Sequence, residues 1–107
     1  MSPRWILLAL FFVAPCGPLS TSAHAATIQI VMDDLVFSPA EASARVGDTI
    51  EWVNRDAFAH TATARNGDFD VILPPKKTIT SVLSKAGVIE YYCRYHPNMK
   101  AVLKIAP

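Results

Sequence analysis

The sequence has little net charge, few cysteines and no apolar run long enough to cross a membrane. Its 10 lysines and arginines nearly balance its 9 aspartates and glutamates, and a formal net charge of +1 excludes a strongly basic nucleic-acid-binding protein. The unbroken apolar run, Trp5 to Ala14, is shorter than the roughly 20 residues that a membrane-spanning helix needs. With 107 residues, of which 51% are hydrophobic, the chain has room for one folded domain and is not a disordered tail.

The N-terminal residues have the organisation of a secretory signal peptide. Arg4 precedes the apolar run, a segment with two prolines follows it, and Ala23-His24-Ala25 matches the small-x-small pattern of a cleavage site. We expect cleavage after Ala25 or within a residue or two, which divides the chain into a signal peptide, residues 1–25, and a mature domain, residues 26–107. An uncleaved interfacial or buried helix and a lipoprotein anchor at Cys16 are alternatives, although no apolar-small-small pattern precedes that cysteine.

Removal of the signal peptide changes what the remaining residues imply. Of the 107 residues 82 remain, with 9 basic and 9 acidic side chains, and Cys93 becomes the only cysteine. His60 and His96 become the only histidines. A single cysteine in an oxidising compartment has no partner for an internal disulfide, so its thiol calls for another explanation.

Short segments separated by turn signals indicate an all-β domain. Residues 49–54 are the clearest case, because Ile50 and Trp52 fall on one face of a strand and Glu51 falls on the other. Residues 40–44 would pass as a helical turn, but they lack an apolar stripe. Seven to eight short strands favour a β-sandwich or a small barrel. They are drawn from the segments 27–32, 35–37, 42–46, 49–54, 60–64, 69–73, 78–83, 88–93 and 101–105.

The residues that carry chemistry fall into one short motif and one separate histidine. Cys93, His96 and Met99 place a thiolate, an imidazole and a thioether at positions i, i+3 and i+6, at the end of an expected strand and in the loop after it. His60 adds a second imidazole at the start of another expected strand, and loops from two such places can meet at one end of a sandwich. Two imidazoles and a thiolate in a trigonal plane, with a weak axial thioether, are the ligand set of a blue-copper electron-transfer site.

Each of these residues has an ordinary explanation when it is taken alone. A lone cysteine on a strand is commonly a small buried hydrophobe, a lone histidine is a satisfied surface or core residue, and a lone methionine fills a gap. Zinc also competes for cysteine and histidine, although its usual structural ligand sets lack methionine. Taken together, the only cysteine, both histidines and one of two methionines of the mature chain fall into a single pattern, which favours copper.

The motif and the strand before the first histidine resemble those of the cupredoxins, small blue copper proteins. Residues 46–54, with the sequence VGDTIEWVN, are similar to the family's strand before its first histidine ligand. The short Cys-x2-His-x2-Met spacing, with Pro97 after the histidine, is most similar to that of the amicyanin-like members. The resemblance implies a Greek-key β-sandwich with one type 1 copper at one end. The implied ligands are His60, Cys93 and His96 in the equatorial plane and Met99 in the axial position.

The resemblance implies a carrier of single electrons rather than an enzyme. Copper would alternate between Cu(I) and Cu(II), and the transient partners would be redox proteins, a dehydrogenase or cytochrome as donor and an oxidase or cytochrome as acceptor. The signal peptide and the fold together suggest a periplasmic monomer without a membrane anchor. Two alternatives stay open: a copper storage, delivery or sensing module, and a hydrolase that uses Cys93 as nucleophile with His96 or His60 as base.

Residues around the ligands have expected roles as well. A ligating histidine usually has its other ring nitrogen hydrogen-bonded, and Asn54 or a backbone carbonyl is expected to orient His60. Thr61 stands where the family often has an asparagine that ties the two ligand loops together. Partner docking is expected to use an apolar rim and nearby cations that steer an acidic partner. The rim residues are Phe58, Ala59, Pro74, Pro75 and Pro97, and the cations are Lys76, Lys77, Arg94 and Lys100.

Overall fold

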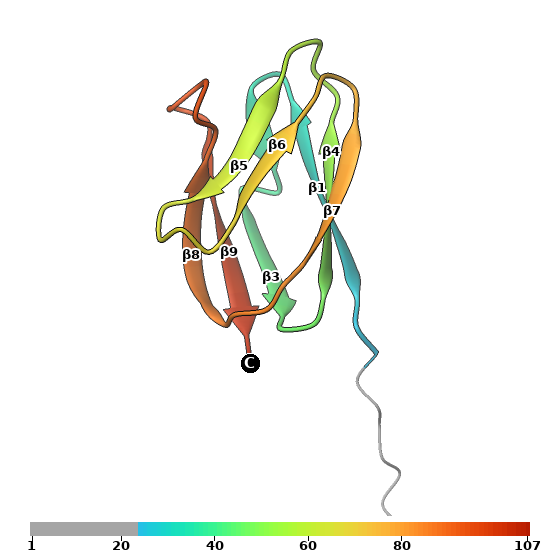
Figure 1. Cartoon of the computed structure of the whole chain (residues 1–107), viewed down its shortest axis with the longest axis vertical. Coiled ribbons are helices and arrows are strands. Elements are labelled where there is room, and N and C mark those ends of the chain that lie inside the picture. Colours follow the sequence, from blue (N-terminus) through green and yellow to red (C-terminus); the bar gives the residue numbers. More distant parts are fainter. Residues whose placement is uncertain (1–23) are drawn as a thin grey trace, which may run out of the picture.

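The computed structural model describes residues 24–107, which fold into two β-sheets packed face to face (Figure 1). Residues 1–23, which hold all but the end of the predicted signal peptide, lie outside the described part. Residues 24–107 form nine strands and no helix, so this part of the chain contains no helix that could cross a membrane. The strands are β1 (Thr27–Asp33), β2 (Val36–Ser38), β3 (Glu41–Arg45), β4 (Thr49–Asn54), β5 (His60–Ala64), β6 (Asp70–Leu73), β7 (Thr78–Val82), β8 (Gly87–Tyr92) and β9 (Lys100–Ala106).

The two sheets confirm the expected all-β sandwich, with nine strands where seven to eight were expected. The four-stranded sheet has the order β2-β1-β4-β7, and the five-stranded sheet has the order β3-β9-β8-β5-β6. The count is higher because two short edge segments both find partners: β2 pairs with β1, and β3 pairs in parallel with β9. Residues 40–44, the candidate helical turn, lie mostly in β3, where Ala42 and Ala44 are buried and alternate with exposed residues.

Alternating burial along the strands builds one core between the sheets. In β4, Ile50 and Trp52 are both buried, as the alternation predicts. The ring of Tyr91 in β8 lies edge-on to Trp52 and Phe37, with centroids 5.4 and 4.8 Å away. Side chains two residues apart on a strand share a face, so Cys93 points into the same interior as Tyr91. The aromatic packing around Tyr91 therefore holds β8 in place, and Cys93 directly follows this strand.

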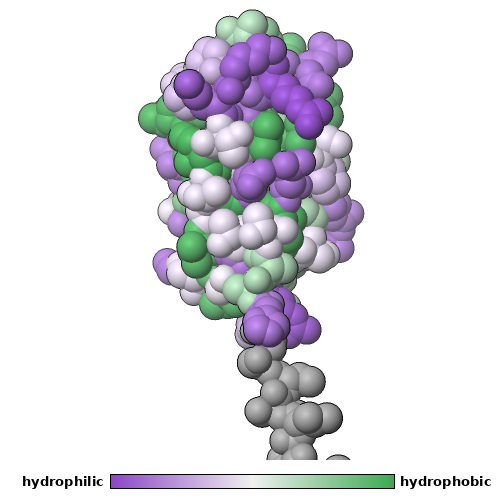
Figure 2. All heavy atoms as spheres, turned by 90° about the vertical axis from the view of Figure 1, so that its right-hand side faces the viewer, coloured by the Kyte–Doolittle hydropathy of each residue, from purple (hydrophilic) through white to green (hydrophobic). Residues whose placement is uncertain are grey.

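Four connections meet at one end of the sandwich, the upper end in Figure 1. They are the turn between β1 and β2 and the loops after β4, β6 and β8. The turn reverses sharply because Asp34 and Leu35 adopt positive φ values of 52° and 63°. Pro74 and Pro75 follow β6 directly and, as expected, lie in no central strand. On the face shown in Figure 2, hydrophilic residues gather near this upper end.

Candidate metal centre

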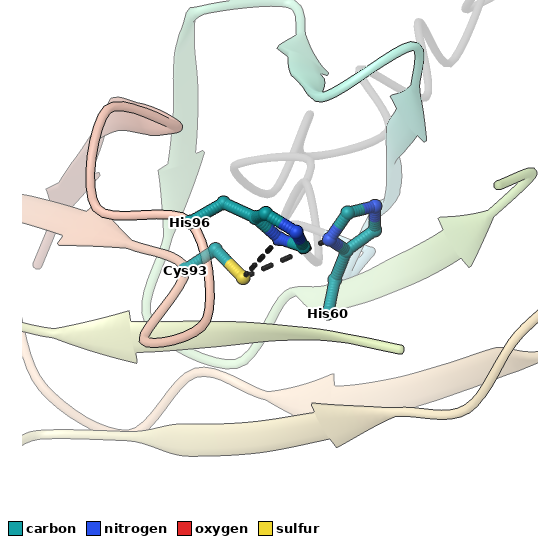
Figure 3. Close-up of side chains that lie close together, drawn as sticks. All are labelled: His60, Cys93 and His96. Atoms are coloured by element: carbon teal, nitrogen blue, oxygen red, sulfur yellow. Dashed lines mark hydrogen bonds between the residues drawn. The ribbon is translucent and has the colours of Figure 1, made fainter. Parts of the chain in front are cut away.

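Three of the predicted ligands lie at strand ends and in a loop that meet at the upper end. His60 is the first residue of β5, Cys93 directly follows β8, and His96 lies in the loop before β9. Because β5 and β8 are hydrogen-bonded neighbours in one sheet, His60 and Cys93 come together although they are 33 positions apart. The three side chains point toward one another (Figure 3).

The donor atoms of these residues form one tight group. The Sγ of Cys93 lies 3.7 Å from Nδ1 of His60 and 3.6 Å from Nδ1 of His96, and the potential ligand atoms all lie within 4.8 Å of one another. His60 and Cys93 are fully buried, whereas His96 is partly exposed. Two imidazole nitrogens and one sulfur thus converge on a single space, as the sequence motif predicts.

Met99, the predicted axial ligand, is buried at the end of the same loop and is only 3% exposed. The loop is closed by hydrogen bonds between main-chain groups of the candidate ligands themselves. The N–H of Cys93 donates to the carbonyl of Met99 at 2.9 Å, and the N–H of Met99 donates to the carbonyl of His96 at 2.8 Å. One tight loop therefore carries three of the four predicted ligands.

A carboxylate that the sequence analysis did not single out holds His60. Oδ2 of Asp56 lies 2.7 Å from Nε2 of His60, and both residues are buried. The prediction that Asn54 or a backbone carbonyl orients this ring is therefore wrong. The only signal for Asp56 in the sequence is an acidic residue four positions before a histidine. That signal is weak because Asp56 lies in a loop, where no strand alternation indicates the direction of a side chain.

The Asp56 carboxylate is itself held in place. Its burial opposes ionisation, but the hydrogen bond from His60 and those from two backbone amides outweigh that effect and hold the pKa of Asp56 below its ordinary value. The amides belong to Asp34 and Leu35, at 2.8 and 3.2 Å. The ionised carboxylate accepts the hydrogen bond of Nε2. In the neutral ring, Nδ1 of His60 therefore has the lone pair that can bind a metal.

Asn54 fixes the loop that carries Asp56. Its Oδ1 accepts the amide N–H of Asp56 at 2.9 Å. Its Nδ2 donates to the carbonyls of Phe58, Leu73 and Pro74, at 3.0, 3.2 and 3.2 Å. The buried amide thus joins the loop after β4 to the end of β6.

Thr61 connects the two segments that supply the ligands, the role that the family often gives to an asparagine. Its main-chain N–H donates to Sγ of Cys93 at 3.3 Å. Its Oγ1 accepts the main-chain N–H of Arg94 at 2.9 Å. The backbone and the hydroxyl of one threonine together make the connection.

Part of the expected apolar rim lies beside the partly exposed His96, namely Phe58 and Pro97. The ring of Phe58 lies 5.2 Å from His60 and 5.5 Å from His96, centroid to centroid, and Phe58 is 44% exposed. Pro74, Pro75 and Pro97 are exposed, and Ala59 is half-buried. A surface hollow of about 380 Å³ lies beside this rim. It is lined by Leu35, Tyr95, His96, Pro97, Asn98 and Met99.

Two of the four cations expected to steer a partner already interact with other groups of the protein. Nη2 of Arg94 lies 3.2 Å from Oδ2 of Asp70, so its charge is compensated. Nζ of Lys76 donates to the carbonyl of Arg55. Lys77 and Lys100 are exposed.

The donor set fits type 1 copper better than it fits the alternatives. One thiolate, two imidazoles and a nearby buried thioether are the ligands of that site. Zinc accepts cysteine and histidine, but its usual structural sites do not employ methionine. A cysteine nucleophile has to reach a substrate, and Cys93 is fully buried, which counts against a hydrolase.

Comparison with known proteins identifies relatives of this chain. A cupredoxin-like domain matches residues 4–105. The chloroplastic plastocyanin of Tetradesmus obliquus is 29% identical over 102 residues, which cover 81% of this chain and 70% of that protein. The amicyanin of Paracoccus denitrificans is 26% identical over 87 residues, which cover 74% of this chain and 66% of that protein.

The solved structures show the same fold. The purple cupredoxin of Nitrosopumilus maritimus aligns with a TM-score of 0.64 at 24% identity, over 74% of this chain and 99% of that chain. Because the family match extends over nearly the whole sequence and over both segments that supply the candidate ligands, the chain belongs to the cupredoxin-like family.

Proposed function

We propose that the mature chain, residues 26–107, is a blue copper protein that carries single electrons between redox partners. The observation that carries this proposal is the convergence of Cys93 Sγ with the Nδ1 atoms of His60 and His96, at 3.7 and 3.6 Å. In this proposal those three residues are the equatorial ligands of one copper, and the buried Met99 is its axial ligand. The similarity to plastocyanin and amicyanin supports the same class of protein.

The residues around the donors keep them in place while the charge of the site changes. Bound copper would supply a one-electron couple between Cu(I) and Cu(II). His60 is held by Asp56, and the sulfur of Cys93 receives the amide N–H of Thr61. These contacts already exist within the fold, so little has to move when an electron arrives or leaves. The partly exposed His96 is the proposed point of electron entry and exit.

We place the mature protein in the periplasm, as a monomer that meets its partners transiently. The pattern of residues 1–25 supports export and cleavage of a signal peptide. Exposed Phe58, Pro97 and Tyr95 lie around His96 and offer an apolar surface, and small electron-transfer interfaces bury little area. The proposed partners are proteins with redox centres, a dehydrogenase or cytochrome on one side and an oxidase or cytochrome on the other.

Addition of Cu(II) to the mature protein tests the proposal. We expect an intense visible band from the thiolate and a narrow copper hyperfine splitting. Cys93→Ser should abolish the band while the protein stays folded, because serine fills the same space without a thiolate. A folded parent protein whose Cu(II) form is colourless would contradict the proposal.

A copper storage, delivery or sensing module would use the same ligands. The rate at which the protein gives up its copper distinguishes such a module from an electron carrier. Full burial of His60 and Cys93 favours slow release, and therefore electron transfer. Copper-loaded protein mixed with excess chelator should retain its visible band. Loss of the band within seconds would favour the handling module instead.

A further inference from the structure

Behind the candidate ligands, on the outer face of the five-stranded sheet, four residues form a closed ring of hydrogen bonds. The main-chain N–H of Arg94 donates to Oγ1 of Thr61 at 2.9 Å, and that oxygen lies 2.9 Å from Oγ1 of Thr63. Oγ1 of Thr63 donates to Oδ1 of Asp70 at 2.7 Å, and Oδ2 of Asp70 lies 3.2 Å from Nη2 of Arg94. The ring begins and ends on Arg94, the residue directly after Cys93. We call Thr61, Thr63, Asp70 and Arg94 the polar ring.

Strand pairing explains why these residues meet. Thr61 and Thr63 are two positions apart in β5, so their side chains share one face of the sheet. Asp70 of β6 is the Cα partner of Thr63 on one side, and Tyr92 of β8 is its Cα partner on the other. Two residues beyond Tyr92, the antiparallel register brings Arg94 beside Thr61. The ring is therefore part of the sheet that also carries the candidate ligands.

A count of protons fixes the direction of every hydrogen bond between the hydroxyls and the carboxylate. Each threonine hydroxyl has one proton, and a carboxylate only accepts. Thr63 therefore donates its proton to Asp70, and its oxygen accepts the proton of Thr61. The Thr61 oxygen is left as an acceptor, and it accepts the main-chain N–H of Arg94. The bonds run in one direction from the loop that holds the ligands to Asp70, and bonds chained in this way strengthen one another.

We propose that Thr63 and Asp70 are positioning residues that set the place of the Cys93 sulfur, although neither touches it. They act through Thr61, whose N–H donates to Sγ of Cys93 at 3.3 Å and whose hydroxyl they hold in the orientation that accepts from Arg94. Without them the Thr61 hydroxyl is free to rotate, and its hold on the residue next to the cysteine weakens. The effect on a copper site rests on the proposed function, whereas the ordering of the loop does not.

Amide hydrogen exchange in the metal-free protein tests the ring itself. Thr61→Val removes the acceptor and is expected to speed exchange of the Arg94 amide about 2- to 10-fold, the effect of one typical hydrogen bond. Thr63→Val and Asp70→Ala, which leave that acceptor in place, should each speed the same amide about twofold or more. Thr63→Ser keeps the hydroxyl and should restore the parent rate. The control is Thr80→Val, the same change at an exposed threonine of β7 in the other sheet, which should leave the rate unchanged.

Two outcomes overturn the proposal. The first is an Arg94 amide that exchanges at the control rate in both Thr63→Val and Asp70→Ala. The second comes from the copper-loaded protein. There, Thr63→Val is expected to shift the visible thiolate band and the reduction potential, and Thr63→Ser is expected to keep both at the parent values. An unchanged band and potential in Thr63→Val overturn the positioning role. A folded protein that takes up no copper refutes the proposed function, and amide exchange then decides the ring alone.

Discussion

Asp56 fixes both the orientation of the His60 ring and the nitrogen that faces Cys93. A carboxylate only accepts, so Nε2 carries the proton of the 2.7 Å hydrogen bond, and in the neutral ring Nδ1 is the nitrogen without a proton, 3.7 Å from the sulfur. The amides of Asp34 and Leu35 hold the same carboxylate from the other side. The tautomer of one candidate ligand therefore depends on a residue outside the ligand set.

Asp56→Asn is expected to lower copper affinity about 10- to 100-fold, the usual cost of losing a hydrogen-bond partner of a ligating histidine. The neutral amide of the asparagine accepts the Nε2–H of His60 more weakly than the carboxylate does. The amide can also turn its own N–H toward Nε2, which already carries a proton, so that no hydrogen bond forms. Competition with a chelator of known affinity measures the change. Asp33→Asn, at an exposed aspartate in β1, is the matched control and should bind copper like the parent. Equal affinity of Asp56→Asn and this control would contradict the role of Asp56.

Met99→Gln is expected to keep copper bound and to lower the reduction potential. A thioether is a soft ligand that favours Cu(I), and a harder amide oxygen in the axial position shifts the preference toward Cu(II). For a one-electron couple, each tenfold change in that preference corresponds to about 59 mV. Redox titration of the blue band measures the potential. A variant with the spectrum and potential of the parent would show that Met99 is not the axial ligand.

Among the elements, strands could be predicted from the sequence and the loops that support the site could not. The predicted segments 49–54 and 60–64 coincide with β4 and β5, because alternation of apolar residues is a local property. The ligand motif around Cys93 is equally local. The direction of Asp56 is not, because it depends on hydrogen bonds from Asn54 to carbonyls 19 and 20 positions later. Such distant contacts leave no periodic signal in a single sequence.

At the opposite end of the sandwich, Asp48 joins the start of β1 to the turn before β4. Its Oδ1 accepts the amide of Ala26 and its Oδ2 accepts the amide of Arg45, both at 2.8 Å. Those hydrogen bonds, the one from Ala26 first, outweigh desolvation and hold the pKa of Asp48 below its ordinary value of 3.8. Since the pKa is lower in the folded state, the stability that this group contributes is present above pH 3.8 and is lost as the pH falls below it.

Signal-peptide cleavage after Ala25 would change this contact. The amide of Ala26 would become a charged N-terminal ammonium beside the Asp48 carboxylate, where the nitrogen already lies 2.8 Å from Oδ1. A chain that starts at Ala26 is expected to melt at a higher temperature than one that starts at His24, with a difference that shrinks as salt screens the ion pair. Asp48→Asn should remove the difference. Thermal unfolding at low and high salt measures it, and equal melting temperatures at low salt would argue against the ion pair.

Across the whole molecule, the candidate site connects the two sheets. His60, Cys93 and Met99 belong to strands of the five-stranded sheet or directly adjoin them, whereas Asp56 follows β4 of the four-stranded sheet. Asp56 also binds the turn after β1, in that same four-stranded sheet. The hydrogen bond between His60 and Asp56 therefore crosses from one sheet to the other. A metal that fixes His60 would also fix how the sheets pack at this end.

Copper is therefore expected to stabilise the entire fold rather than one loop. A ligand at 100 times its Kd that binds only the folded state adds about 2.7 kcal/mol, which raises the melting temperature of a domain of this size by roughly 10–20 °C. Thermal unfolding at increasing copper concentrations measures the shift, and Cys93→Ser should lose it. An equal shift in Cys93→Ser would place the stabilising copper away from the cysteine. Asp56→Asn should show a smaller shift than the parent at the same copper concentration, because both the affinity and the link between the sheets are weakened.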